Sequence, residues 1–209
     1  MTESQPKKLY VFDFDGTITT KDTFALFLRY YAGNINWIAK IIQLLPTFIA
    51  YKCRFVDRHS VKKAVIMRFF KNEPETRIMA KAEQFAADII PSLIRPKAQA
   101  RLDELLKGPN SVPESLYICS ASISPYLKAW ARSCGIQESH VLAVELESNL
   151  HQMTGRIDGY NVWGSNKVRR IQDEFYPQSV EIKEAYGDSE GDRELLHAAQ
   201  ASFYRPFRV

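Results

Sequence analysis

The stretch Val11-Phe12-Asp13-Phe14-Asp15-Gly16-Thr17 places two aspartates two positions apart at the end of an apolar run. Successive side chains of a strand point to opposite faces, so the carboxylates of Asp13 and Asp15 share one face. Two like charges held that close need a bound cation or a retained proton. The pair therefore predicts a metal site, an acid/base pair, or both, and Gly16 permits a sharp turn directly after it.

A hairpin turn centred on Asp15 and Gly16 is the alternative interpretation of this stretch. It would require a second alternating strand, and none follows. Residues 21–31 instead have helical spacing, and Asp22 is a natural N-cap for that helix. The chain is thus expected to run from a strand into a helix.

Short apolar runs of the kind found in buried parallel strands recur along the chain. We expect strands at residues 9–15, 115–119, 141–146, 180–186 and 201–204, with helices at 125–134, 167–175 and 192–199. Strands that alternate with helices predict an α/β fold with a doubly wound, Rossmann-like parallel sheet. Ligands of such sheets bind at the carboxyl ends of the strands, where Asp13 and Asp15 lie.

Residues 21–95 interrupt this alternation, because their patterns are helical throughout. Helices are expected at 24–31, 37–51, 60–70 and 76–90. We interpret 21–95 as an inserted all-helical domain, and 1–20 with 96–209 as the α/β core domain. A helix at 97–107, with Pro96 near its first turn and Gly108 at its end, returns the chain to the sheet.

The most apolar part of the insertion, residues 35–51, raises the question of a membrane. Its 17 residues are interrupted by Lys40, Gln43 and Pro46, and are too few for a spanning helix. We expect a buried or groove-lining helix pair broken near Pro46. An interfacial helix that rests on lipid is the alternative.

Charge is distributed unevenly along the 209 residues. Residues 21–100 carry 14 Lys and Arg against 6 Asp and Glu, which leaves 14 against 18 for the remainder. A solvated helical surface would explain the basic segment. The more specific explanation is that this segment attracts an anionic substrate or an anionic membrane surface.

The three cysteines and the N-terminal residues, which lack an apolar signal segment, favour reduced thiols and a cytoplasmic location, including the periphery of the inner membrane. Cys119 adjoins several small hydroxyl residues, but no arginine follows within that loop to bind a phosphate. We interpret Cys119 as a buried strand residue and not a nucleophile.

Two later positions offer groups that could bind an anion. Ser120 follows the second expected core strand, and its hydroxyl, with the N–H groups of the turn at Ala121 and Ser122, could bind phosphate oxygens. Capping of the next helix by serines is the alternative. Lys167 begins a helix, where a cation opposes the helix dipole. An anionic ligand would explain that placement, and a solvated surface lysine is the alternative.

A cluster of acids follows the strand expected at 180–186. Asp188 ends that strand, and Asp192 lies one helical turn further on, so both carboxylates can face one cation. An N-cap aspartate among surface acids is the alternative. The four histidines (His59, His140, His151 and His197) have no metal-ligand spacing.

Taken together, these motifs resemble those of haloacid dehalogenase superfamily phosphatases. The match runs in order through 13–17, Ser120, Lys167 and 187–192, and the helical insertion resembles the type 1 cap of that family. Within the superfamily, the chain is similar to the subgroup that contains phosphoserine phosphatases and bacterial phosphatidylglycerophosphate phosphatases.

The resemblance implies a role for each matched residue. Asp13 would be the nucleophile that forms a phosphoaspartate, and Asp15 the general acid and base. Ser120, Lys167, Gly16 and Thr17 would bind the phosphoryl group. Mg²⁺ would be held by the Asp13 carboxylate, the Asp15 backbone carbonyl and Asp188, with Asp192 as support.

The resemblance thus predicts a magnesium-dependent phosphatase, a hydrolase of phosphomonoesters. The apolar stretch at 35–51 favours a lipid phosphate such as phosphatidylglycerophosphate, and phosphoserine or another small metabolite is the alternative substrate. Asp22 matches a cap-side acid of phosphoserine phosphatases but is equally an N-cap. We expect no nucleic-acid partner and a peripheral membrane contact through the basic cap. A mutase and a catalytically silent binding protein of the same fold remain as alternatives.

Overall fold

The computed structural model describes residues 6–208, and within them six strands form one sheet. The strands are β1 (Lys7–Phe12), β2 (Leu116–Ile123), β3 (Val141–Asn149), β4 (Gln152–Asp158), β5 (Val180–Gly187) and β6 (Ala201–Tyr204). Their order across the sheet is β4-β3-β2-β1-β5-β6, and every neighbouring pair is parallel except β3 and β4. The predicted doubly wound α/β fold is confirmed.

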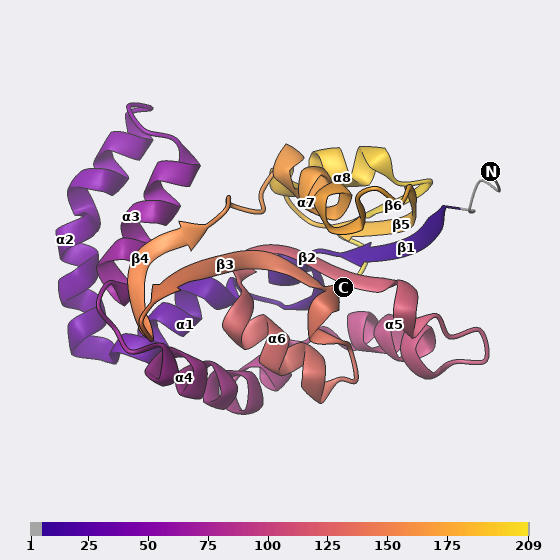
Figure 1. Cartoon of the computed structure of the whole chain (residues 1–209), viewed down its shortest axis with the longest axis horizontal. Helices are drawn as coiled ribbons and strands as arrows, with labels where there is room; N and C mark the ends of the chain where they lie inside the picture. The colour runs from indigo at the N-terminus through magenta and orange to yellow at the C-terminus, as the bar shows by residue number, and fades with distance from the viewer. Residues whose placement is uncertain (1–5, 209) are drawn as a thin grey trace.

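Helices cover both faces of this sheet (Figure 1). Helices α7 (Ser165–Phe175) and α8 (Arg193–Ala198) lie on one face, and α5 (Pro96–Lys107) and α6 (Ser124–Ser133) lie on the other. Strand β1 is central and covered on both sides, so its Leu9, Val11 and Phe12 are fully buried. This burial explains why the part of the strand from Leu9 to Phe12 is a continuous apolar run and not an alternation.

Four helices gather at one end of the molecule, beyond the carboxyl end of β1 (Figure 1). They are α1 (Thr23–Ala32), α2 (Asn34–Lys52), α3 (Arg58–Phe70) and α4 (Glu75–Asp88). Tilted and edge-to-face aromatic contacts join these helices to one another and to α6. The Phe27 ring centroid of α1 lies 5.3 Å from that of Phe85 in α4 and 5.1 Å from that of Tyr126 in α6. The division into a core domain and a cap at 21–95 stays a prediction.

The expected helix pair broken near Pro46 is wrong, because α2 is a single helix. The helix is continuous through Pro46, which is exposed on its surface. Proline removes one backbone donor from a helix, and that loss is tolerated best where water reaches the freed carbonyl. Part of the helix lines a cavity, as expected, but much of its apolar surface is exposed. Within residues 6–208, no helix combines the length and the apolar character needed to cross a membrane.

Strand β4 was not expected, and β3 is longer than the predicted strand at 141–146. The two strands form an antiparallel hairpin whose turn residues, Leu150 and His151, both have positive φ. Turns of that geometry favour asparagine and glycine, so neither residue signals a turn in the sequence. The hairpin reaches the helical end of the molecule, where Asn72 donates to the Met153 carbonyl at 2.8 Å. Gly155 permits the close approach, since a Cβ there would lie 2.8 Å from the Lys71 side chain.

Candidate active site

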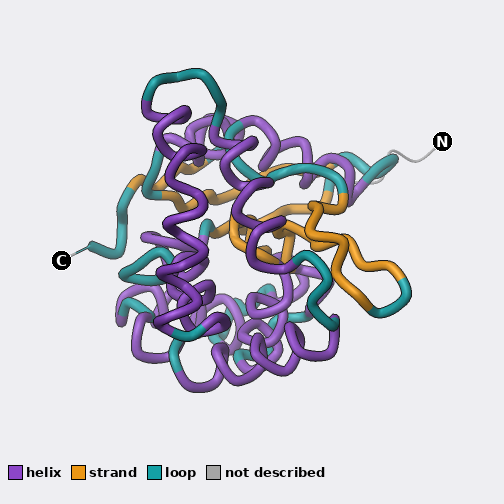
Figure 2. Tube along the Cα trace, turned by 90° about the vertical axis from the view of Figure 1, so that its left-hand side faces the viewer, coloured by secondary structure: helices purple, strands orange, loops and turns teal. Residues whose placement is uncertain are grey.

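The predicted site residues converge on one cavity of about 600 Å³ at the carboxyl ends of the parallel strands. Asp13 follows β1, Ser120 lies near the end of β2, Asp188 follows β5, and Lys167 lies in the first turn of α7. Figure 2 turns the molecule so that the helical end faces the viewer, with helices standing in front of the strands. The cavity lies between these helices and the strand ends, and residues from both parts line it.

Lys167 is the centre of the polar end of the cavity. Its side chain is only 2% exposed, and its Nζ donates to Asp13 Oδ1 and to Asp192 Oδ1, both at 2.6 Å. Burial opposes the charge on this ammonium, but the carboxylates of Asp13 and Asp192 outweigh it and raise the pKa of Lys167 above its usual value. Lys167 is therefore a buried group paired with two carboxylates, and the alternative of a solvated surface lysine is wrong.

Asp13 is held from two sides. Lys167 bonds one carboxylate oxygen, and the Thr17 hydroxyl donates to the other at 3.0 Å. Burial raises the pKa of Asp13 to about 7, although the nearby ammonium of Lys167 lowers it. The carboxylate is thus fixed in orientation and poorly solvated, which are the two properties that a nucleophilic carboxylate needs.

Asp15 points away from this cluster and has its own partners. Its Oδ1 accepts from the backbone N–H of Thr23 at 2.7 Å and from the Thr23 hydroxyl at 2.5 Å, and its Oδ2 accepts from the Ser122 hydroxyl. Burial, together with the charge of Asp22, raises the pKa of Asp15. A raised pKa suits a carboxyl that carries a proton for part of a reaction.

Ser120 lies in the same cavity but in a different local structure from the one expected. Strand β2 continues to Ile123, and its pairing with β3 is irregular between Cys119 and Ile123. The Ser120 hydroxyl accepts from the N–H of Ser122 at 3.1 Å. Helix α6 has no side-chain cap, so the alternative that these serines cap it is wrong.

Three carboxylates could hold a cation among the described residues. Oxygens of Asp13, Asp188 and Asp192 all lie within 4.8 Å of one another. Asp192 has the most donors of the three, because one oxygen accepts from Lys167 and the other accepts from the N–H groups of Asp188 and Ser189 and from the Ser189 hydroxyl. This leaves Asp13 and Asp188 to face a metal, with Asp192 as the residue that positions them.

This arrangement fits a hard divalent cation such as Mg²⁺. The oxygen-only ligand set suits such an ion, and burial with the charge of Asp192 raises the pKa of Asp188, so a cation would relieve an existing repulsion. Gly16 leaves the necessary room, since its φ is +80° and a Cβ there would lie 2.4 Å from Asp188 Oδ2. The Asp15 carboxylate is not part of the group, and Arg208, which the sequence did not suggest, forms an ion pair with Asp188.

Basic side chains from α3 also line the cavity, and sequence reasoning missed them. Lys62 Nζ lies 3.1 Å from the centroid of the Phe24 ring, and burial lowers the pKa of Lys62 to about 7 against the attraction of Asp22 and Asp15. Arg58 lies over the Trp163 ring. No motif marks these residues, since they lie far from the strand ends in sequence.

Asp22 serves as the N-cap of α1, where its side chain accepts from the Ala25 N–H at 2.9 Å, and it also lines the cavity. Cys119 is fully buried in β2, and burial raises the pKa of its thiol to about 12. The interpretation of Cys119 as a buried strand residue is confirmed, because a thiol with that pKa supplies almost no thiolate.

The wall of the cavity that comes from the helical end is mostly apolar, apart from Asp22, Arg58 and Lys62. Its apolar side chains belong to α1, α2 and α3, and they are Phe24, Leu28, Trp37, Ile41, Phe48, Val61 and Val65. The cavity is therefore amphiphilic, with ionised groups at the strand ends and a hydrocarbon surface between the helices. It matches a ligand with an anionic head and an apolar body.

Comparison with known proteins shows the family of the chain. Residues 10–197 match the family model described as haloacid dehalogenase-like hydrolase. The chain belongs to that family and is a hydrolase. It is 34% identical over 203 residues to Protein CicA of Caulobacter vibrioides, an alignment that covers 96% of this chain and 86% of the relative.

Solved structures share the fold at lower identity. A protein of unknown function from Bordetella pertussis superposes with a TM-score of 0.76 at 18% identity, over 96% of this chain and 90% of that one. A phosphoserine phosphohydrolase-like protein from Francisella tularensis gives a TM-score of 0.60 at 18% identity, over 93% and 84%. A substrate-bound phosphoserine phosphatase gives 0.58 at 16% identity, over 96% and 86%.

Proposed function

We propose that the protein is a Mg²⁺-dependent phosphatase that hydrolyses a phosphomonoester of an apolar alcohol, such as a lipid phosphate, through a phosphoaspartate at Asp13. The observation that carries the proposal is the amphiphilic cavity, in which the aspartates and Lys167 lie at one end and seven apolar side chains line the other. A phosphate at the strand ends would leave the alcohol part of the substrate between α1, α2 and α3.

The residues divide the chemistry as follows. A carboxylate oxygen of Asp13 attacks phosphorus, and the bond to the leaving alcohol oxygen breaks as Asp15 protonates that oxygen. Asp15 then takes a proton from a water molecule, which attacks phosphorus and releases phosphate and the free Asp13 carboxylate. The hydrogen bonds from Thr23 and Ser122 hold the Asp15 carboxyl in place for both transfers.

Lys167 and Ser120 stabilise charge on the phosphoryl oxygens, and Thr17 keeps the attacking carboxylate oriented. Asp13 and Asp188 would hold Mg²⁺, which supplies positive charge beside the transferring phosphoryl group when bound. Lys167 favours the ionised form of Asp13, because its charge lowers the pKa that burial raises.

A series of primary alkyl phosphates of increasing chain length tests the substrate class. Burying each methylene group contributes about 0.8 kcal/mol, which corresponds to roughly a fourfold gain in kcat/KM per carbon until the apolar end is filled. Ile41→Asn should flatten this dependence, because Ile41 lines the cavity. Ile42→Asn is the matched control, since the neighbouring Ile42 is 58% exposed on the outer side of the same helix.

Phosphoserine is measured in the same series. A kcat/KM for phosphoserine above that of every alkyl phosphate, with no dependence on chain length, would contradict the apolar substrate and favour the small-metabolite alternative. Turnover that survives thorough chelation of divalent cations would contradict the metal-dependent mechanism.

A further inference from the structure

Helix α2 carries a row of exposed aliphatic side chains on the surface of the molecule. The row consists of Ile35, Ile38, Ile42, Leu45 and Ile49, each between 47% and 84% exposed. Their spacing alternates between three and four residues, so they form one continuous stripe along the helix. Helix α2 is the outermost helix at its end of the molecule, and Figure 1 shows no other element covering its outer side.

The stripe is continuous with the lining of the active-site cavity. At 100° per residue, the apolar side chains between Ile35 and Ile49 occupy an arc of roughly 220°, and no polar side chain interrupts it. One part of this arc holds Trp37, Ile41 and Phe48, which line the cavity. The other part is the exposed stripe. A helix that only packed on α3 would need a much narrower apolar face.

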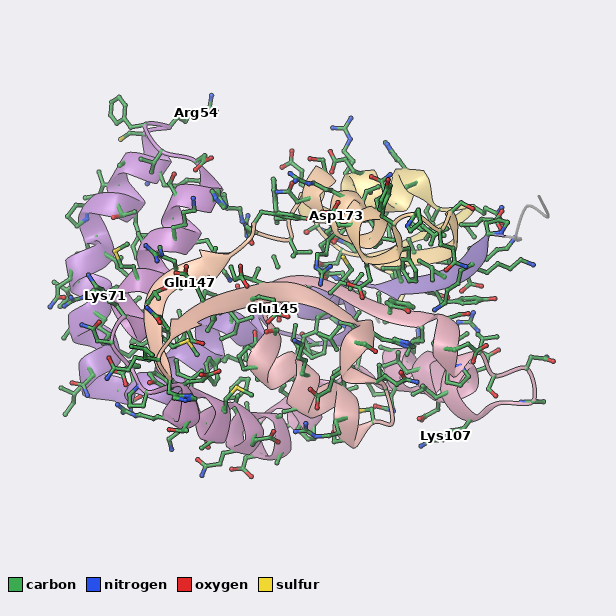
Figure 3. All side chains as sticks on the ribbon, in the orientation of Figure 1. Arg54, Lys71, Lys107, Glu145, Glu147 and Asp173 are labelled. Atoms are coloured by element: carbon green, nitrogen blue, oxygen red, sulfur yellow. The ribbon has the colours of Figure 1, made fainter. Side chains whose placement is uncertain are left out.

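The segment that carries this apolar surface is strongly basic. Residues 34–71 contain eight Lys and Arg but one acid, Asp57. The loop after α2 combines both features, because Phe55 is 84% exposed and lies between the exposed Arg54 and the partly exposed Val56. Figure 3 shows Arg54 at the tip of this loop, pointing away from the body of the protein.

We propose that the stripe of α2 and the loop that follows it dock on an anionic lipid bilayer, with α2 lying in the plane of the interface. Aliphatic side chains would enter the boundary between headgroups and acyl chains, and the flanking Lys and Arg would bind anionic headgroups. One consequence of docking rests on the proposed function: an apolar substrate can pass from the bilayer along α2 into the cavity. Docking itself is measured without turnover.

Charge favours an anionic bilayer over a second copy of the same chain as the partner of the stripe. Pairing of two stripes would bring two segments together that each carry eight basic residues and one acid, and these segments would repel each other. An anionic bilayer has the opposite charge. The same argument predicts that docking weakens as ionic strength rises.

Co-sedimentation of the full chain with vesicles tests the proposal. Vesicles of phosphatidylcholine with phosphatidylglycerol should bind the protein at least about tenfold more tightly than vesicles of phosphatidylcholine alone, and the difference should shrink in high salt. The double variant Ile38→Gln/Ile49→Gln should reduce binding to the anionic vesicles by at least about tenfold. Both side chains are more than half exposed, so the variant keeps the packed core.

The matched control is Met79→Gln/Leu150→Asn, which removes two exposed apolar side chains outside α2 without a change in net charge. This control should bind vesicles as the wild type does. Equal binding by the stripe variant and the wild type would overturn the proposal. So would a wild-type dimer that the stripe variant converts to a monomer, because the stripe would then join two copies.

Hydrolysis of a short alkyl phosphate without vesicles separates this proposal from the proposed function. A protein that hydrolyses the ester but ignores the vesicles contradicts docking alone. A protein that binds the vesicles through the stripe but hydrolyses no phosphomonoester contradicts the proposed function alone.

Discussion

Replacing Lys167 with methionine tests how the candidate site is held together before any substrate binds. In the folded protein the Lys167 Nζ contacts both Asp13 and Asp192 at 2.6 Å, and all three side chains are less than 10% exposed. Methionine has a similar volume but no charge, so it leaves two buried carboxylates without a cation. Breaking a buried ion pair by removing one partner costs about 3–5 kcal/mol.

Thermal unfolding in the presence of EDTA measures this cost. In a protein of about 200 residues, each kcal/mol lowers Tm by roughly 2–4 °C, so Lys167→Met should melt roughly 6–20 °C below the wild type. Mg²⁺ should raise the Tm of the variant more than that of the wild type, because the cation replaces the missing charge between the carboxylates and binds only the folded state.

The loss of stability should also depend on pH. The pKa of Asp13 is about 7 in the wild type, and removal of the Lys167 charge raises it further. The folded variant therefore retains a proton that the folded wild type releases above pH 7. Stability falls with rising pH wherever the folded state binds more protons than the unfolded state, so the gap in Tm should widen above pH 7.

Lys183→Met is the control, since Lys183 forms a partly exposed pair with Glu181 at 3.2 Å. Such pairs contribute less than about 1 kcal/mol, so this variant should melt close to the wild type. The reasoning is refuted if Lys167→Met melts within about 2 °C of the wild type in EDTA, or if Mg²⁺ stabilises both proteins equally.

Two further perturbations probe the cavity. The pKa of Lys62 is about 7, so this side chain loses its positive charge as pH rises through 7. KM for an alkyl phosphate should therefore increase several-fold by pH 8.5. In a pH profile of KM, Lys62→Arg should abolish that increase, because arginine keeps its charge. An unchanged KM across this range would show that Lys62 does not attract the phosphate. Gly16→Ala places a Cβ 2.4 Å from Asp188 Oδ2 at a positive φ, and should weaken Mg²⁺ binding at least about tenfold by isothermal titration calorimetry. Wild-type affinity in this variant would remove Asp188 from the proposed metal site.

The sheet was predictable because its buried strands keep their apolar character whatever packs on them. Strand β1 is apolar from Leu9 to Phe12, and the polar groups that follow it gather at its carboxyl end. Strand β4 was not predictable, since only two of its seven residues are buried and its turn, at Leu150 and His151, lacks the residues that mark a tight hairpin.

The residues that the helices contribute to the candidate site could also not be predicted from the sequence. Lys62 and Arg58 lie on a basic helix among several other cations, and nothing in their spacing indicates which of them face inward. Helix α2 shows the same limit. Its apolar residues predict burial, but its outer side remains exposed, because apolar character alone does not say whether protein or another partner covers a surface.

Trapping of the covalent intermediate tests the central claim most directly. The protein is mixed with an alkyl phosphate carrying a radioactive phosphoryl group, quenched in acid during turnover, and digested with trypsin. Cleavage after Lys8 and Lys21 releases the peptide that contains both Asp13 and Asp15. Our account predicts that fragmentation of this peptide places the phosphoryl group on Asp13, and that Asp13→Asn yields no labelled peptide. A label on Asp15 or on another peptide, or turnover that persists in Asp13→Asn, would contradict it.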